Sequence, residues 1–340
     1  MANKLKKSPK IWKLAKDLGI RLTDDPVTDI LHYCDRKIKN YLKEFPNCST
    51  LSSLLEWIAG KAGTTFEEVH TDDDLQQIQS KYLNKNEKIF VTLDEDLLSK
   101  DVYGITYKLT NREPWEPMFV SVIDCRGEKA FRSYYTKWHE IAHLLVLTDQ
   151  MRLSYQRTQH LNPMQDPEEA LIEIIAGNFG FYAPIIKKHA KDEISFGAIE
   201  GLCTELCPGS SYQASLIGFV RAWPKSCILA YCRPALKKKE EDLLMQRGFD
   251  FHKPPQAVLR ATKITLSESA RKDNFRIFEN MRVPTASIIH NVYTGLSDYS
   301  EAEENLSWWE TSDGFRLPDC HIRTKAKRLW DSVYALIIPL

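Results

Sequence analysis

The sequence lacks an excess of charge, a long apolar run and a secretory signal, which would indicate nucleic-acid binding, membrane insertion and secretion respectively. Its 340 residues contain 46 basic and 46 acidic side chains, so the net charge favours neither a nucleic acid nor a membrane as partner. No apolar run reaches the length of a membrane span. The lysine-rich first residues have no apolar core and no cleavage signature, so we expect no secretory signal and a cytoplasmic protein.

A regular cysteine pattern is also missing. Eight cysteines lie at irregular spacings, and a chain with no secretory signal is expected to keep them reduced. The pairs Cys203-x-x-x-Cys207 and Cys227-x-x-x-x-Cys232 do not have the spacing of ordinary zinc ribbons. We interpret these four cysteines as small, buried apolar residues rather than metal ligands.

What the chain does contain is His-Glu-x-x-His at residues 139–143. Helical residues four apart lie on one face, so His139 and His143 can bind one metal ion from the same helix. Glu140 follows His139 and can reach a water on that metal. This arrangement is typical of zinc hydrolases, in which two imidazoles hold Zn²⁺ and the carboxylate takes a proton from the water.

The alternative is a helix whose polar residues fall at this spacing by chance. Apolar residues surround the motif on the chain, which predicts a largely buried helix: Ile141, Ala142, Leu144, Leu145 and Val146. A buried glutamate next to two histidines needs partners, because an uncompensated buried charge is costly. The flanking sequence therefore favours a metal site.

A zinc site of this type needs a third protein ligand. Asp166-Pro167 predicts the start of the next helix, in which Glu168 and Glu169 complement the helix dipole of the first turn. Glu173 differs, because its neighbours in the chain are apolar and a carboxylate there needs compensation. We therefore predict Glu173 as the third ligand, with Glu169, one turn earlier, as the alternative.

These residues resemble the ImmA/IrrE-type metallopeptidases, which are gluzincin-like zinc endopeptidases. The similarity covers about residues 50 to 225 and rests on a short set of motifs: Tyr135-Thr136-x-x-His139-Glu140-x-x-His143-Leu144-Leu145, Glu173-x-x-Ala176-x-x-Phe179 and Pro184. The run from Val120 to Cys125, with Arg126-Gly127 and Phe131-Arg132, is similar to the family's lead-in to the active helix.

The resemblance implies a function as well as a site. It implies that His139, His143 and Glu173 bind zinc, that Glu140 is the general base, and that the substrate is a helix-turn-helix transcriptional repressor cut in a stress response. It also implies that an extended substrate pairs with a strand edge beside the zinc. The family's Asn or Asp four residues after the ligand, which orients a zinc-bound histidine, is Gly177 here.

The oxyanion of the reaction would need a donor from the same region. Arg152, Tyr155 and His160 lie on the connection between the two metal helices, and one of them could donate to the oxyanion. The remaining histidines have no partners at metal-ligand spacing.

The expected fold class is α+β. We expect a helical segment at residues 1–50, a zincin-like metallopeptidase domain at 51–222 and a small α/β domain at 223–340, similar in size and elements to the GAF-type sensory domains of longer relatives. Helices are predicted at 11–18, 27–45, 51–63, 72–82, 167–183, 194–222 with a break at 209–211, 267–280 and 300–309. Strands are predicted at 89–93, 103–109, 119–124, 227–232, 257–266, 283–293 and 334–338.

Two other functions remain open from the sequence. The domain could keep its zinc but act as a catalytically silent binding module, which senses a ligand through residues 225–340 and binds a partner without cutting it, and Gly177 favours this reading. The basic amphipathic helix at 11–18 could bind nucleic acid, although we favour its interpretation as a docking helix with a solvated lysine face.

Overall fold

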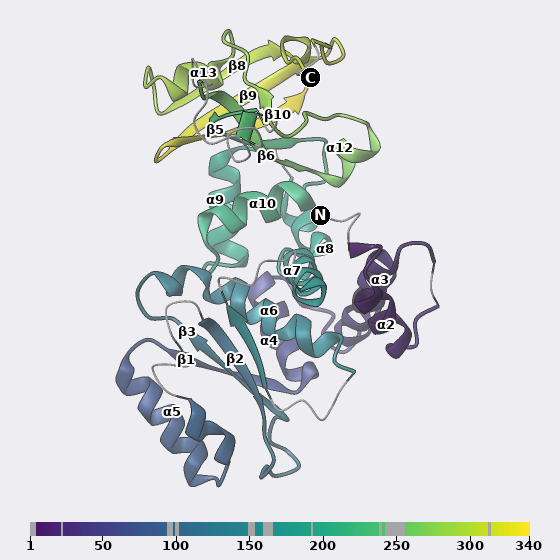
Figure 1. The fold of residues 1–340 in the computed structure, drawn as a ribbon, viewed down its shortest axis with the longest axis vertical. Coiled ribbons are helices and arrows are strands. Elements are labelled where there is room, and N and C mark those ends of the chain that lie inside the picture. Colours follow the sequence, from purple (N-terminus) through teal and green to yellow (C-terminus); the bar gives the residue numbers. More distant parts are fainter. Residues whose placement is uncertain are drawn as a thin grey trace. The chain divides into compact units, whose positions relative to one another are not determined.

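The computed structural model describes residues 5–21, 23–93, 98, 102–148, 154–158, 166–191, 193–237, 240–241, 256–311 and 314–340, with only the backbone of 154–158. It is an α+β protein, as expected, and its helices and strands are shown in Figure 1. The chain divides into two compact units. Residues 1–185 and 202–215 form the first, and residues 186–201 and 216–340 form the second.

The first unit is built on a four-stranded sheet with the order β1-β3-β2-β4. β1 (Thr64–Val69) pairs in parallel with β3 (Phe119–Asp124), and β2 (Val102–Lys108) is antiparallel to both β3 and β4 (Ser154–Thr158). The segment between the His-Glu-x-x-His motif and Asp166 therefore supplies a strand, β4, at one edge of the sheet.

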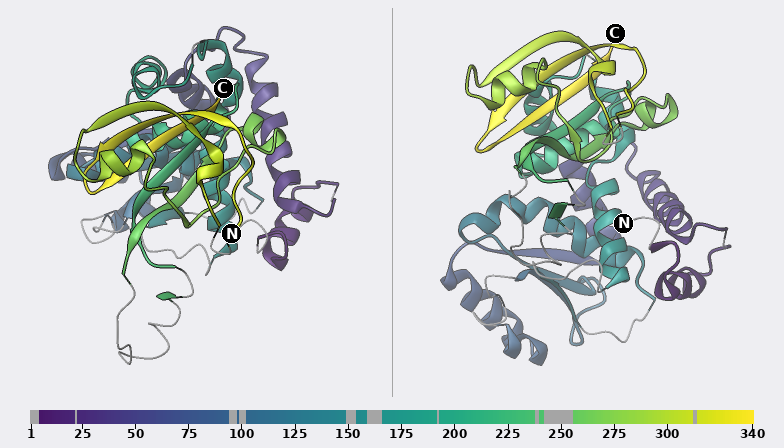
Figure 2. Two further views of the ribbon diagram at one scale, coloured as in Figure 1. Left: turned by 90° about the horizontal axis from the view of Figure 1, so that it is seen from above. Right: turned by 45° about the horizontal axis from the view of Figure 1, so that its top comes forward.

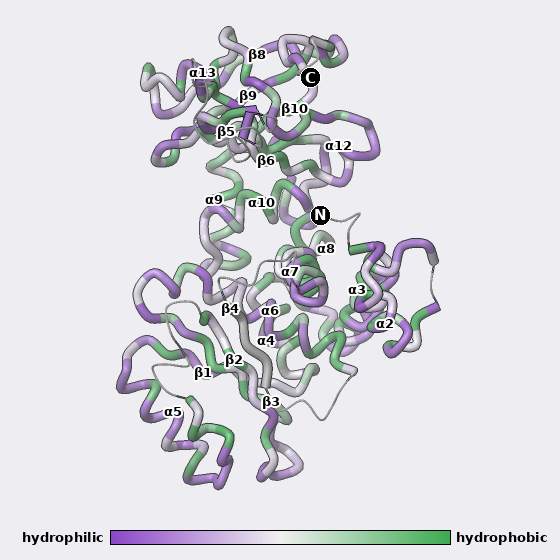
Figure 3. Tube along the Cα trace, in the orientation of Figure 1, coloured by the Kyte–Doolittle hydropathy of each residue, from purple (hydrophilic) through white to green (hydrophobic). Residues whose placement is uncertain are grey.

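The two faces of this sheet differ in chemistry. One face is apolar and packs against α5 (Asp72–Asn84) through residues that include Ile105, Tyr107, Val120 and Val122. Figure 3 shows hydrophobic residues along the strands. On α5, hydrophobic and hydrophilic residues alternate along the helix, as expected for a surface helix with one apolar face. The other face carries buried hydroxyl side chains and packs against α6 (Ser133–Leu145), which contains the His-Glu-x-x-His motif.

Helices complete the unit around α6. α4 (Leu51–Ala62) packs against α6 and β1, and α7 (Pro167–Phe179) packs against α6. α4 begins at a capping box formed by Thr50 and Ser53 and ends at Gly63, whose φ of 78° favours glycine.

The basic N-terminal helix is a docked helix. α2 (Pro9–Asp17) buries Ile11 and Ala15 and contacts α3 (Pro26–Leu42) and α7. The helices within residues 5–50 thus belong to the same compact unit as the motif helix. The boundaries at residues 50 and 222 stay predictions.

The second unit contains a six-stranded antiparallel sheet with the order β7-β6-β5-β10-β9-β8, and Figure 2 gives two further views of it. Its strands are β5 (Ile228–Ala235), β6 (Val258–Leu266), β7 (Met281–Arg282), β8 (Tyr299–Asn305), β9 (His321–Leu329) and β10 (Ser332–Pro339). Its short helices are α12 (Glu268–Lys272), α13 (Ile288–Tyr293) and η3 (Leu306–Trp308). α8 (Ala183–His189), α9 (Phe196–Leu206) and α10 (Tyr212–Ala222) contribute residues to both units.

Four predicted elements are wrong. Most of the strand predicted at 89–93 is the 3₁₀ helix η1 (Lys88–Thr92), and the side chain of Gln79 donates to backbone carbonyls of this segment. The helix predicted at 267–280 is limited to α12, which ends before Asn274 at a φ of 56°. The strand predicted at 283–293 contains α13 instead, because Ser287 caps a helix there. The helix predicted at 300–309 is mostly β8.

One described helical stretch, Pro167–His189, has the length and hydropathy of a membrane span. Because 61% of its apolar window is buried inside the protein, the stretch fits a core helix, and its composition is weak evidence for a membrane.

Candidate metal site

The motif helix brings its two histidines together as the spacing predicts. His139 and His143 are buried on one face of α6, and their Nε2 atoms lie 3.2 Å apart. Two imidazole nitrogens at this distance with both rings buried are positioned to share one ion.

The third ligand atom comes from Glu169 on α7. Its Oε2 lies 3.3 Å from Nε2 of His139, and its Oε1 lies 3.5 Å from Nε2 of His143. Ligand atoms about 2.0–2.1 Å from a tetrahedral metal ion are about 3.3–3.4 Å from one another. The three observed separations match that spacing, so the donor set fits a tetrahedral metal ion.

This arrangement corrects the predicted third ligand. The prediction chose Glu173, but the carboxylate that faces both Nε2 atoms is that of the alternative residue, Glu169. Glu173 is 40% exposed and its Oε1 lies 3.3 Å from Nδ1 of His139, on the opposite side of the ring. The prediction rests on the apolar residues beside Glu173 in the chain. Those residues do not determine which turn of α7 faces α6, because that depends on how the two helices pack.

The correction also changes the interpretation of Gly177. With Glu169 as the ligand, the position four residues later is Glu173, which reaches the outer nitrogen of a metal-facing histidine. A carboxylate in that place orients the imidazole and makes Nε2 a better ligand. Glu173, one turn before Gly177, is therefore close enough to Nδ1 of His139 to take this role, although its contact is an ion pair at 3.3 Å and not a hydrogen bond.

The electrostatics of Glu169 are consistent with this role. Burial raises the pKa of Glu169, but hydrogen bonds and charge from His139 and His143 outweigh that effect and hold the pKa far below its usual range. The carboxylate is therefore ionised at neutral pH, as a metal ligand must be.

Glu140 points to the sheet side of α6 and is fully buried. Its Oε2 accepts a hydrogen bond of 2.7 Å from the hydroxyl of Thr106 on β2. Its Oε1 has no hydrogen-bond partner among the described residues. A buried carboxylate oxygen without a donor is costly and is the expected sign of a missing water or ion, so this atom supports a metal-bound water at the site.

A cleft of about 310 Å³ opens on the ligands. It is lined by residues of α2, α6 and α7, with the chain that follows α6: Lys13, Leu14, Asp17, His143, Val146, Leu147, Thr148, Glu168, Glu169 and Ile172. The docked N-terminal helix thus forms one wall of the approach to the two ligands His143 and Glu169.

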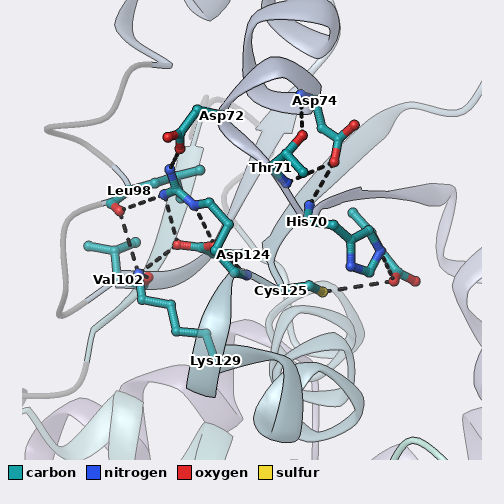
Figure 4. Close-up of polar contacts among 11 residues, drawn as sticks. His70, Thr71, Asp72, Asp74, Leu98, Val102, Asp124, Cys125 and Lys129 are labelled. Atoms are coloured by element: carbon teal, nitrogen blue, oxygen red, sulfur yellow. Dashed lines mark hydrogen bonds and ion pairs between the residues drawn. The ribbon is translucent and has the colours of Figure 1, made fainter.

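A charge network fixes the turn that leads into α6. Figure 4 shows the buried carboxylate of Asp124, at the end of β3, beside Lys129, whose side chain donates a hydrogen bond to it. The same carboxylate accepts hydrogen bonds from Arg126, which also pairs with Asp72. Arg126 and Lys129 in turn donate to the backbone carbonyls of Leu98 and Val102 respectively. The network ties the start of the motif helix to β2 and β3.

Replacing Asp124 with Asn should destabilise this unit by about 3–5 kcal/mol, because it removes the buried carboxylate that Arg126 and Lys129 share and leaves Lys129 without its anion. Burial raises the pKa of Asp124, but hydrogen bonds from Arg126 and Lys129 hold it below its ordinary value of about 3.9. The carboxylate therefore stabilises the fold above pH 4, and its contribution is lost as pH falls through the lowered pKa.

Denaturant unfolding of the full chain at pH 7 and below pH 4 checks this. The matched control is Asp72→Asn, which removes the 62% exposed partner of the same arginine and should cost at most about 1 kcal/mol. Equal losses for the two variants, or a loss that does not shrink in acid, would contradict the role of Asp124.

A second group of metal-ligand side chains lies near this network. Among the described residues, Glu68, His70 and Cys125 also have ligand atoms within 4.8 Å of one another. Here Lys137 already neutralises Glu68 at 2.6 Å, and burial raises the pKa of the Cys125 thiol to about 12. A thiol that keeps its proton is a poor ligand, so this group is less suited to a metal ion than the first.

The described structure leaves other predicted residues untested. Arg152 and His160 lie outside the described residues, and Tyr155 is described only by its backbone in β4, opposite Thr106. The eight cysteines are free, and six of them are buried. No sequence pattern indicates Thr106 at the site, because its contact with Glu140 depends on the packing of β2 against α6.

Comparisons of the chain with protein-family models and with curated proteins found no match.

Proposed function

We propose that this chain is a zinc-dependent endopeptidase that cuts a specific protein substrate. The observation that carries the proposal is the convergence of three ligand atoms, from His139, His143 and Glu169, at the spacing of a tetrahedral ion. Zinc suits two imidazoles and a carboxylate, and three protein ligands leave a fourth position for water. The zincin-like character of the first unit is part of this proposal.

When bound, zinc would supply a water acidic enough to lose its proton near neutral pH. Glu140 would take that proton as the water attacks the scissile carbonyl and then pass it to the leaving amine. Thr106 already occupies Oε2 of Glu140, so Oε1 is the oxygen that would accept the proton. Glu173 would hold the ring of His139 through Nδ1.

The substrate class rests on the resemblance to ImmA/IrrE-type peptidases, which implies a helix-turn-helix repressor. The cleft beside His143 and Glu169 offers a route to the ligands. An extended segment of the repressor could also add to the backbone of β4, which lies at the edge of the sheet. A GAF-type sensory role for the second unit would make the cut depend on a signal.

The test is to incubate the purified, zinc-loaded full chain with each helix-turn-helix repressor encoded beside its gene. Cleavage at one site is expected with zinc and not with a chelator, and added zinc should restore it. His143→Ala is the matched control for a contaminating protease, because it removes a ligand and leaves the rest of the cleft.

Two outcomes would contradict the proposal. A protein that contains no metal after purification and takes up no zinc on titration would have no such site. A protein that binds zinc and one of these repressors tightly without cutting it would be the catalytically silent module instead. Gly177 favours that alternative, whereas the carboxylate of Glu173, 3.3 Å from Nδ1 of His139, supports the peptidase.

A further inference from the structure

We infer that Thr106 is a positioning residue for the base Glu140, and that a row of buried hydroxyls across three strands holds it in that role. This inference rests on the proposed function. The row runs from Thr64 on β1 to Ser121 on β3, at 3.0 Å, and from Ser121 to Thr106 on β2, at 2.7 Å. Thr106 then donates to Oε2 of Glu140 at 2.7 Å.

The number of protons fixes the direction of the row. Each hydroxyl has one proton to donate. Because Thr106 donates its proton to Oε2 of Glu140, the bond between Thr106 and Ser121 must be donated by Ser121. Ser121 then has no proton left, so the 3.0 Å bond between Ser121 and Thr64 is donated by Thr64, whose other acceptor, the carbonyl of Thr65, is farther away at 3.3 Å. Three hydroxyls thus point their protons in one direction, toward the carboxylate, and bonds aligned in this way strengthen one another.

The location of the row argues against a purely structural origin. Thr64, Ser121 and Thr106 are buried on the sheet face that packs against α6, where apolar side chains would pack without hydrogen bonds to satisfy. The opposite face of the same strands is apolar at Ile105, Val120 and Val122. The chain therefore places three hydroxyls on the one face that contacts Glu140.

Gly104, two residues before Thr106, complements this arrangement. A Cβ atom at Gly104 would lie 3.3 Å from Oε1 of Glu140 and only 2.8 Å from Cγ2 of Thr136. The absence of a side chain at Gly104 lets Thr136 and the carboxylate of Glu140 pack closely against β2. β2 thus holds one oxygen of the carboxylate through Thr106, whereas the other, Oε1, has no hydrogen-bond partner among the described residues.

The first measurement needs neither substrate nor metal. The infrared band of the Glu140 carboxylate in the metal-free full chain is identified as the band that Glu140→Gln removes. Thr106→Val, which is isosteric but has no hydroxyl, should shift this band, and Thr106→Ser should leave it in place. An unshifted band in Thr106→Val would overturn the inference whether or not the chain is a peptidase.

The second measurement is kinetic and uses the repressor that the wild-type chain cuts. Thr106→Val should lower kcat by about 10- to 100-fold, the usual effect of losing an outer-shell partner, with KM and zinc affinity within about twofold. Thr106→Ser should restore most of kcat. A loss in Thr106→Ser equal to that in Thr106→Val would show that only the methyl group matters and would overturn the inference.

Ser121→Ala keeps the inference testable if Thr106→Val does not fold. It removes one oxygen atom and deprives Thr106 of its donor, so it should lower kcat by a smaller factor and shift the same band less. An unchanged kcat together with an unchanged band in Ser121→Ala would contradict the hydroxyl row. Failure of the wild-type chain to cut any repressor would contradict the proposed function alone, because the infrared result stands without it.

Discussion

Replacing Glu140 with Gln should leave zinc bound and lower the turnover of the protein substrate by about 10²- to 10⁴-fold, the usual contribution of general acid–base catalysis. Gln keeps the size of the side chain and an oxygen that can accept from Thr106, but its amide cannot take a proton from water. The three atoms that converge on the metal position belong to other residues, so the metal should remain. Turnover and bound zinc are measured on the same preparation.

Glu128→Gln is the matched control for this prediction, because Glu128 is exposed on the lead-in to α6 and lines neither the cleft nor the ligand group. Its turnover should equal that of the wild-type chain. If Glu140→Gln still cuts at a tenth of the wild-type rate or faster, another group must take the proton and the role of Glu140 is lost.

The second large effect is expected at the two glutamates of α7. Glu169→Gln should weaken zinc binding by more than the 10- to 100-fold typical of outer-shell partners, because a neutral amide replaces the carboxylate between both Nε2 atoms. Glu173→Gln should stay within that 10- to 100-fold range, because Glu173 reaches only Nδ1 of His139. Competition with a chromophoric chelator measures both affinities.

These two variants control for each other, since they carry the same substitution one turn apart on one helix. The order of the two effects decides the ligand. A larger loss of zinc affinity in Glu173→Gln than in Glu169→Gln would return the ligand to the residue predicted from the sequence, with Glu169 in a supporting role.

The helix predicted at 300–309 is wrong because strand pairing overrides the helix preference of the residues in this segment. The residues of β8 include several glutamates, which favour helices in isolation. In the sheet, Glu301 lies opposite Lys325 and Glu303 opposite Arg323 on the neighbouring strand β9. Arg323 and Glu303 form an ion pair of 3.2 Å. Cross-strand charge pairs of this kind arise only after β9 has taken its place, so the segment alone could not reveal them.

Local sequence patterns are sufficient to predict those helices and strands whose caps and apolar residues are close together in the chain. The capped helix that starts at Leu51, the helix that Asp166 and Pro167 begin, and the strand Phe119–Asp124 depend on caps and on runs of apolar residues. The spacing of His139 and His143 likewise follows from 3.6 residues per turn, so the sequence by itself determined that two imidazoles would face one point.

Tertiary structure decided the rest of the candidate site. Glu169 and Glu173 lie one turn apart on α7, and the way α7 packs against α6 determines which of them faces the Nε2 atoms. The contact between Thr106 and Glu140 depends in the same way on how β2 lies beneath α6. Both contacts depend on the relative position of two secondary-structure elements. Local sequence patterns do not determine that position, because it results from the packing of the whole unit.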